Sequence, residues 1–219
     1  AASDVYKRQY QLRLRTQTKL SEMMRFWVTP FPVVEEEHPF ADRDGARNDT
    51  PEHAQTIPFG STISGISTSN ELANDWDVYR VTLEKGQRVT CQMLNARLGT
   101  VHGGGLTDMA IEVRSPSGKR VARNSRSALF AHDPVLSFAA PEAGDYLITV
   151  RQQMDTEISW AHYALHVADF PRPAITFPLG GQLGEELDLE VFYTDGAKGT
   201  LKAKLPEKVG LFEQSMVDL

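Results

Sequence analysis

The sequence predicts an all-β protein built around an antiparallel β-sandwich. Apolar residues alternate with polar residues in many short segments, which is the pattern of strands with one buried and one solvated face. Twelve prolines and sixteen glycines are scattered along the 219 residues and mark turns between these segments. Helical periodicity is absent over any useful length between residues 75 and 167. Short strands joined by close turns are typical of a sandwich.

Composition excludes several classes of protein. The net charge of −6 argues against a general nucleic-acid binder, because such proteins neutralise phosphates with an excess of basic residues. No apolar run reaches the ~18 to 20 residues that a membrane span requires, so no segment is expected to cross a membrane. The single cysteine, Cys91, excludes an internal disulfide and cysteine-based zinc sites.

The N-terminal part divides into three pieces. Residues 1–9 contain Asp-Val-Tyr-Lys-Arg-Gln, which looks like the translation of a transposon end used in sequencing-library preparation, and they are excluded from fold reasoning. Residues 10–34 alternate through Leu12 and Leu14 and then reach the aromatic run of residues 25–28, so they are expected to be the last strands of a preceding β domain. The acidic stretch at residues 35–37 and the polar residues up to Thr50 are interpreted as a linker.

The sandwich strands follow the linker in order. Alternating apolar positions predict strands near residues 79–83, 89–93, 109–113, 136–138, 146–150 and 163–167, with turns at residues 85–86 and 115–118. The predicted core consists of the inward apolar residues of these strands: Tyr79, Val81, Val89, Cys91, Ile111, Leu136, Phe138, Tyr146, Ile148 and Leu165. After Pro171 and Pro173 a new unit begins, which alternates from Leu187 to Tyr193 and has too few strands to close a core.

Five short motifs in this block occur in an order that resembles the bacterial pre-peptidase C-terminal domain. Each motif alone is weak evidence, whereas five in the same order are specific. They are Asn48-Asp49-Thr50-Pro51-Glu52 with Ala54-Gln55, Asp75-Trp76-Asp77-Val78-Tyr79, Glu84-Lys85-Gly86-Gln87, Asn95-Ala96-Arg97-Leu98-Gly99 with Asp108, and Pro141-Glu142-Ala143-Gly144-Asp145-Tyr146. The fourth motif fits the version found in planctomycete-type surface proteins.

The resemblance implies a jelly-roll-like sandwich over residues 35–170, followed at residues 171–219 by the truncated start of an immunoglobulin-like unit. It also implies a non-catalytic accessory module of a larger exported bacterial protein, secreted or on the cell surface, that spaces or attaches neighbouring domains. Its partners would be the neighbouring domains of the same chain and an extracellular polymer. Two alternatives stay open: the C-terminal accessory part of a secreted peptidase, and a calcium-dependent module that binds collagen-like protein or polysaccharide.

No residue set in the sequence predicts catalysis. A nucleophilic enzyme needs Ser, Cys or Thr beside an oriented base, and no Gly-x-Ser-x-Gly segment occurs. Cys91 lies at an alternating apolar position and is expected to pack as a small hydrophobic residue. His162 and His166 share one face of a predicted strand but lie ~13 Å apart, too far for one zinc ion, so a solvated polar face is expected there.

Calcium is the one cofactor that the resemblance suggests. Calcium binds six to eight oxygen atoms, which loop carboxylates and amide carbonyls supply. Some collagen-binding members of the family hold calcium with a Glu-x-Glu linker pair, an Asn-Asp pair and the Asp-x-Asp segment. The matching residues here are Glu35, Glu37, Asn48, Asp49, Asp75 and Asp77. The alternative is that these are ordinary linker and turn residues, because Asp and Asn favour turns.

The block offers no clear aromatic platform for a polymer. Its tryptophans are Trp160, at a predicted strand start, and Trp76, which is expected to pack at the rim of the sandwich. Aromatic rings on a solvent-exposed face would supply a large contact area for a ligand. Without such a platform, the sequence does not indicate which polymer the module would bind.

Overall fold

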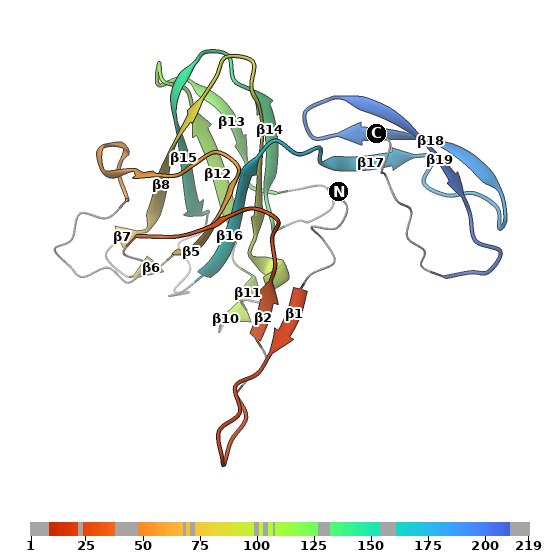
Figure 1. Cartoon of the computed structure of the whole chain (residues 1–219), viewed down its shortest axis with the longest axis horizontal. Helices are drawn as coiled ribbons and strands as arrows, with labels where there is room; N and C mark the ends of the chain where they lie inside the picture. Colours follow the sequence, from red (N-terminus) through yellow and green to blue (C-terminus); the bar gives the residue numbers. More distant parts are fainter. Residues whose placement is uncertain are drawn as a thin grey trace.

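Two five-stranded sheets form the centre of the molecule in the computed structural model (Figure 1). The structure describes residues 9–21, 24–37, 48–67, 69–70, 73–98, 101–102, 105–106, 108–126, 132–153 and 161–210. The first sheet, here called the front sheet, has the order β13 (Arg120–Asn124), β12 (Met109–Arg114), β15 (Gly144–Gln152), β8 (Trp76–Leu83) and β4 (Gln55–Thr56). The second, the back sheet, has the order β14 (Val135–Ala139), β9 (Arg88–Leu94), β16 (Ala161–Ala168), β5 (Ser61–Ser67) and β3 (Val33–Glu35).

The predicted antiparallel pairing is confirmed for the central strands and differs at one edge of each sheet. β3 runs parallel to β5, and β4 runs parallel to β8. β3 comes from the end of the segment that was interpreted as a preceding domain and from the start of the predicted linker, whereas β4 follows that linker, which was expected to end at Thr50. Each of them adds one short edge strand to a sheet, and the sandwich begins at Val33, two residues before the predicted start.

The core between the sheets consists of the residues that alternation predicts. Nine of the ten predicted core residues are buried, and the tenth, Phe138, is half-buried against Tyr146 with ring centroids 6.0 Å apart. The predicted turns at residues 85–86 and 115–118 join β8 to β9 and β12 to β13. The described residues contain no α-helix, only the short 3₁₀ turns η2 (Pro51–His53) and η3 (Ala96–Leu98). Within that part of the chain, no helix is long and apolar enough to span a membrane.

The turn before β15 is fixed by Tyr146 and Gly144. The Tyr146 hydroxyl donates to the carbonyl of Glu142 at 2.7 Å, which closes the turn on itself. Gly144 has a φ of 135°, and a Cβ there would lie 2.8 Å from Cγ of Pro116. Because side chains rarely adopt such a φ and no space exists for one, this turn requires glycine.

The outer face of the back sheet is also buried, which contradicts the predicted solvated face at His162 and His166. His162 is half-buried, and His166 is only 1% exposed. The His166 ring lies 5.9 Å from the rings of Trp27 and Phe31, measured between centroids. Alternation placed both histidines on the face that looks away from the core, but the segment before the sandwich covers that face.

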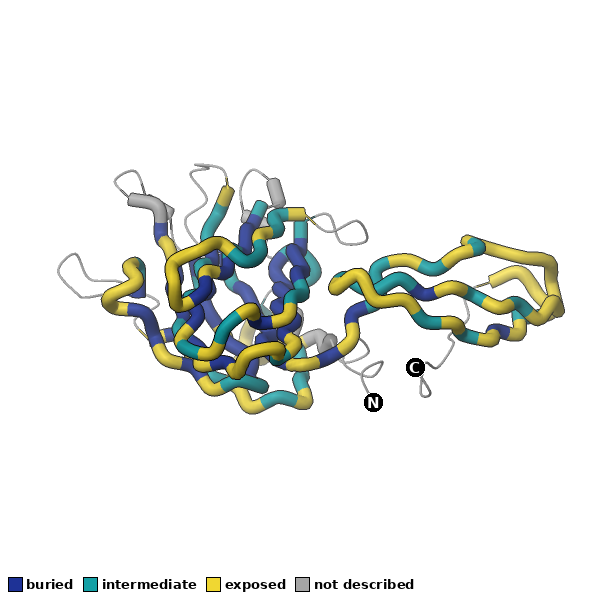
Figure 2. Tube along the Cα trace, turned by 90° about the horizontal axis from the view of Figure 1, so that it is seen from above, coloured by how far each residue is buried: buried dark blue, intermediate teal, exposed yellow. Residues whose placement is uncertain are grey.

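The remaining strands lie outside the sandwich. β1 (Gln9–Leu12) and β2 (Met24–Trp27) pair with each other before the first sandwich strand. The pairs β6 (Ser69–Asn70) with β7 (Ala73–Asn74), and β10 (Val101–His102) with β11 (Gly105–Leu106), are two residues per strand. The unit predicted to begin at residue 171 is an antiparallel sheet of β17 (Pro173–Phe177), β18 (Glu186–Tyr193) and β19 (Lys198–Lys204). Its residues are mostly exposed (Figure 2), and its relation to immunoglobulin domains stays a prediction.

Gly65 should be irreplaceable because it faces Tyr163 across the back sheet. A Cβ at Gly65 would lie 2.3 Å from Cζ of the Tyr163 ring. We expect Gly65→Ala to lower the free energy of unfolding by about 3 kcal/mol, the upper end of the cost of overpacking a core. Urea denaturation measures this change.

Gly180→Ala is the matched control, because nothing lies within 4 Å of a Cβ there and its φ is not in the left-handed range. This variant should change stability by less than about 0.5 kcal/mol. Equal stability of both variants would contradict the close packing of Gly65 against Tyr163.

Candidate functional site

The most unusual feature of the core is an acidic residue at an inward strand position. Asp77 alternates in β8 with Tyr79, which faces the core, and its own side chain is 0% exposed. The Tyr163 hydroxyl on β16 donates to Oδ2 of Asp77 at 2.7 Å and lies 2.5 Å from the hydroxyl of Tyr79. These three side chains therefore join the front sheet to the back sheet by hydrogen bonds inside the core.

Glu36 reaches the same place from the linker. Its amide donates to the carbonyl of Ser64, and its Oε2 accepts from the amide of Ile66 at 2.7 Å. Its carboxyl group is within hydrogen-bonding reach of the Asp77 carboxyl group, and the residue is only 7% exposed. The linker is thus attached to both β5 and β8 through one side chain.

The residues predicted as calcium ligands at this point were Glu35 and Glu37, and the structure exposes both of them. The side chain of Gln55 holds their backbone: Nε2 donates to the carbonyl of Glu35, and Oε1 accepts from the amide of Glu37. Glu36, between them, is the buried one. The sequence alone does not single out Glu36, because Val33 and Val34 are both apolar; only the packing of Val34 against the core shows the phase, and residues two apart in an extended segment share a face.

Three of the other four predicted residues, Asn48, Asp75 and Asp77, lie near Glu36. Asn48 and Asp75 are buried, and Asp49 is half-buried. The Asn48 side chain lies against the Glu36 carboxyl group, and the Asn48 carbonyl accepts from the amide of Val78. Asp75 is close enough to raise the pKa of both Glu36 and Asp77 by charge repulsion. We call Glu36, Asn48, Asp75 and Asp77 the acid cluster.

Burial controls the protonation of the acid cluster. The pKa of Asp77 is raised well above its ordinary value, mainly by burial and then by the charges of Glu36 and Asp75. Burial also raises the pKa of Glu36. Two carboxyl groups that share a site cannot both ionise cheaply, so this arrangement favours retention of one proton between Glu36 and Asp77. The pKa values of Tyr79 and Tyr163 are raised by burial, which keeps both hydroxyls as donors.

The cluster has the chemistry of a calcium site without its closed geometry. Oδ1 of Asp77 and Nδ2 of Asn48 are buried and lack a well-formed hydrogen bond to any described group. Carboxylate and amide oxygens are the ligands that calcium prefers. Across the described residues, no three His, Cys, Asp or Glu side chains stand in metal-binding geometry. To hold an ion, the carboxyl groups would have to turn toward a common point.

Two potentially reactive groups are shielded. Thr62 Oγ1 lies 2.7 Å from Nδ1 of His166, a hydroxyl–imidazole contact of the kind that some nucleophilic enzymes use. Both residues are buried, so their side chains are not accessible to a substrate. Burial also lowers the pKa of His166 to about 4, so its imidazole is a weak base. Cys91 is fully buried, which raises the pKa of its thiol to about 12 and leaves almost no thiolate.

Comparison with known families finds a match to the centre of the sandwich. Residues 75–152, from the acid cluster to the end of β15, match the family model of the bacterial pre-peptidase C-terminal domain. This central part of the sandwich is similar to that family. The matched segment includes Asp75 and Asp77, while Glu36 and Asn48 precede it. Searching the curated proteins gave no match to this chain.

The solved structures that resemble this chain include a pre-peptidase C-terminal domain. The domain from the collagenase of Bacillus anthracis is 20% identical, with a TM-score of 0.41, over 55% of this chain and 99% of that one. PliG of Aeromonas hydrophila, a periplasmic inhibitor of g-type lysozyme, is 21% identical, with a TM-score of 0.34, over 52% of this chain and 95% of that one. CorA of Methylomicrobium album BG8, a surface-associated copper-binding protein, is 12% identical, with a TM-score of 0.37, over 52% and 97%. At such identities and scores these similarities say nothing about what this chain binds.

The raised pKa values predict how stability depends on pH in the absence of metal. The folded chain binds the shared proton more tightly than the unfolded chain does, so this proton stabilises the fold at acidic pH. That stabilisation is lost as the pH rises above the ordinary carboxyl pKa and through the raised one. Asp77→Asn cannot ionise and keeps an acceptor for Tyr163. We therefore expect it to be more stable than the wild type at pH 7.5 in EDTA.

The size of this gain should be about 1.4 kcal/mol for each unit by which the folded pKa exceeds the ordinary one. Urea denaturation at pH 4.5 and 7.5 measures it, and the contribution of His166 cancels because both chains contain it. Glu84→Gln, which removes an exposed carboxylate at the end of the β8 region, is the control and should leave the pH dependence unchanged. If Asp77→Asn follows the wild-type pH dependence, the buried pair does not retain a proton.

Proposed function

We propose that this chain is a non-catalytic accessory module of a larger exported bacterial protein, in which the sandwich holds the neighbouring segments at fixed positions. The similarity to the family supports an accessory role. The main structural support is that the sandwich makes specific side-chain contacts with the segments on both of its sides. A module that only linked its neighbours would not need such contacts.

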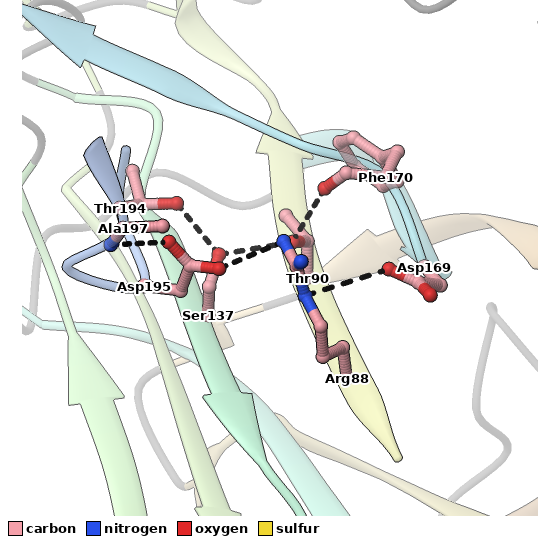
Figure 3. Close-up of polar contacts among 8 residues, drawn as sticks. All are labelled: Arg88, Thr90, Ser137, Asp169, Phe170, Thr194, Asp195 and Ala197. Atoms are coloured by element: carbon pink, nitrogen blue, oxygen red, sulfur yellow. Dashed lines mark hydrogen bonds and ion pairs between the residues drawn. The ribbon is translucent and has the colours of Figure 1, made fainter. Parts of the chain in front are cut away.

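On the C-terminal side, the back sheet bonds directly to the β17–β19 unit (Figure 3). Ser137 on β14 lies 2.6 Å from the hydroxyl of Thr194, at the turn after β18. Arg88 on β9 forms an ion pair with Asp195 at 2.8 Å, and Asp169 lies at 4.0 Å on its other side. Because these contacts flank the connection between the two units, they oppose bending at that connection.

The connection itself is also held. The Thr90 hydroxyl donates to the carbonyl of Phe170 at 2.9 Å and lies 2.9 Å from Ser137 (Figure 3). Beyond the connection, the amide of Thr194 donates to the carbonyl of Arg172. The chain therefore leaves the sandwich along a defined path.

On the N-terminal side, the contact is mainly aromatic. Phe31 packs between His166 and Phe170, with centroid distances of 5.9 and 5.8 Å. The Thr29 hydroxyl lies 3.0 Å from that of Thr62, which in turn contacts His166. Burial of these rings stabilises the docked segment, because apolar area is removed from water.

The test is whether the β17–β19 unit tumbles together with the sandwich. ¹⁵N relaxation should give both units one rotational correlation time in the wild-type chain. The double variant Arg88→Gln/Thr194→Val removes the ion pair and the hydroxyl contact, so the β17–β19 unit should reorient faster than the sandwich. Lys202→Gln, on β19 and away from the junction, should behave as the wild type does.

Two correlation times in the wild-type chain would contradict a module that fixes its neighbours. Hydrolase activity that survives purification and disappears on replacing one Ser or His would contradict the non-catalytic assignment. The family description also fits a secreted peptidase as the parent, with this chain as its C-terminal accessory part. A catalytic domain elsewhere in the same open reading frame would establish that parent.

We further propose that the acid cluster binds calcium, and that calcium fastens the linker to the sandwich. The observation that favours this is that Glu36 and Asp75, both buried, lie close enough to the buried Asp77 to raise its pKa, and that Oδ1 of Asp77 accepts no well-formed hydrogen bond from a described N–H or O–H group. Bound calcium would supply the positive charge that releases the shared proton. The ligands would then be Glu36, Asn48, Asp75 and Asp77, with Glu36 in place of the Glu35 and Glu37 pair. A calcium-dependent site for collagen-like protein or polysaccharide remains the wider form of this proposal.

Calcium should raise the melting temperature of the metal-free chain, because a ligand that binds only the folded state stabilises it by mass action. The gain is roughly 2.7 kcal/mol at a hundredfold excess over the dissociation constant. Magnesium should substitute poorly, because it requires a tighter octahedral shell. Thermal melts in EDTA, calcium and magnesium measure both effects.

Variants of adjacent glutamates provide the control. Glu36→Gln and Asp77→Asn should abolish the calcium effect, whereas Glu35→Gln/Glu37→Gln should retain it, since both side chains are exposed. A melt that calcium leaves unchanged, or one that depends on Glu35 and Glu37 instead, would overturn this ligand set.

A further inference from the structure

The outer face of the front sheet is basic, although the whole chain carries a net charge of −6. Its strands alternate, so every second residue points away from the core. Among the outward residues of β8, β12, β13 and β15, five are arginines and two are acids, Glu112 and Asp145, an excess of three positive charges. The arginines, which we call the arginine face, are Arg80, Arg114, Arg120, Arg123 and Arg151.

Pairing between strands places three of these arginines in one row. Arg120 pairs with Arg114, Arg114 with Leu147, and Leu147 with Arg80. Neighbouring strands lie about 4.8 Å apart, so the backbones of Arg120 and Arg114 are one strand spacing apart and those of Arg114 and Arg80 are two spacings apart, with Leu147 between them. Such a row suits a ligand whose negative charges repeat along its length.

Two arginines of the row are held in place and line a hollow. Nη2 of Arg80 donates to the carbonyl of Pro51, and Nη1 of Arg114 donates to the carbonyl of Gly118. Arg114 also pairs with Glu112 at 2.8 Å. Both side chains, with Leu147 between them, border an open hollow of about 380 Å³ that also touches Glu52 and Asp145. Each guanidinium has five N–H donors, so both keep donors for an anion, and their fixed orientation lowers the entropy cost of binding.

Trp76 adds an aromatic ring to this face, which corrects the expectation that it packs at the rim. Trp76 is 44% exposed, and the Arg151 guanidinium lies 5.2 Å from the centre of its ring. It belongs to β8, four residues before Arg80, and points outward like Arg80. An exposed indole offers a flat apolar surface against which the C–H face of a sugar ring can pack.

We propose that the arginine face binds an acidic polysaccharide, with carboxylate or sulfate groups on Arg80 and Arg114 and a sugar ring against Trp76. This inference rests on the proposed function, because it names the polymer to which the module would attach its parent.

A protein partner fits less well, since stable protein interfaces have a largely apolar core and this face offers only Leu147 and Trp76. Duplex DNA fits less well because it carries one charge per ~1.7 Å, and Glu112 and Asp145 would repel so dense a chain. In a polysaccharide, sugar hydroxyls between the charges can donate to those two carboxylates.

The test measures binding of the full 219-residue chain to polygalacturonate, dextran sulfate, neutral dextran and a 30-base-pair DNA duplex at low salt. Biolayer interferometry with immobilised protein should show binding of the two acidic polysaccharides, weakening as salt is added, and none of neutral dextran. Arg80→Gln/Arg114→Gln should weaken binding about tenfold or more, because each loses charge-assisted hydrogen bonds. Trp76→Ala should weaken binding without changing its salt dependence.

Lys202→Gln/Lys204→Gln is the matched control, since it removes two exposed positive charges on β19 and should leave binding unchanged. If this control loses as much affinity as Arg80→Gln/Arg114→Gln does, binding depends only on the net charge of the chain, and the proposal is overturned. Tighter binding of DNA than of polygalacturonate, or no binding of either acidic polysaccharide, would also overturn it. The relaxation measurement on the β17–β19 unit involves no polymer. A negative result in the polysaccharide binding assay would therefore leave the proposed role in holding neighbouring segments untouched, and the two proposals can fail separately.

Discussion

The hydrogen bond from Tyr163 to Asp77 joins the back sheet to the front sheet, and Glu36 extends this contact to the segment that precedes the sandwich. A buried carboxyl group is costly unless it is hydrogen-bonded or neutralised, so the surroundings of Asp77 are constrained. Gly65 leaves room for the Tyr163 ring, and the alternation of β8 places Asp77 and Tyr79 on the same side. The relative position of the two sheets and the path of the linker both depend on satisfying this one group.

Alternate residues of β8 contribute to two different surfaces. The inward residues Asp77 and Tyr79 belong to the buried network, and the outward residues Trp76 and Arg80 belong to the arginine face. One strand thus carries an acidic interior and a basic exterior on its opposite sides. The junction with the β17–β19 unit lies on the back sheet instead, so the proposed binding face and the proposed attachment of the next unit do not compete for the same strands.

Alternation in the sequence predicted the fold well where it directly controls burial. The period of two identifies which side chains face the core, and nine of the ten predicted core residues are buried for that reason. It could not show that Trp27 and Phe31 cover His166, because a pattern within one strand contains no information about which distant segment packs on it. The parallel edge strands β3 and β4 were missed for a similar reason, since each is only two or three residues long.

For the candidate site, the motifs identified the right region of the chain. They did not identify which glutamate of residues 35–37 faces inward. Asp75, Asp77 and Asn48, three of the residues named from the family resemblance, are buried, whereas Glu36 is the buried acid of its run and its neighbours Glu35 and Glu37 are exposed. Only β3 pairing with β5 determines which of three consecutive glutamates turns inward, and sequence alone does not give that register. Trp76 was expected to pack at the rim, yet it follows the outward phase of β8 and is 44% exposed.

The most direct test of the buried network is a titration of the Asp77 and Glu36 carboxyl carbons by ¹³C NMR in the metal-free chain. Both side chains are buried and lie within hydrogen-bonding reach of each other, so their titrations should be coupled, with the Asp77 midpoint well above the ordinary value of about 3.9. Calcium should lower that midpoint if the cluster binds the ion. Independent titration of the two carboxyl groups at ordinary values would contradict the account, because it would show that both are solvated and that no shared proton joins the linker to the sandwich.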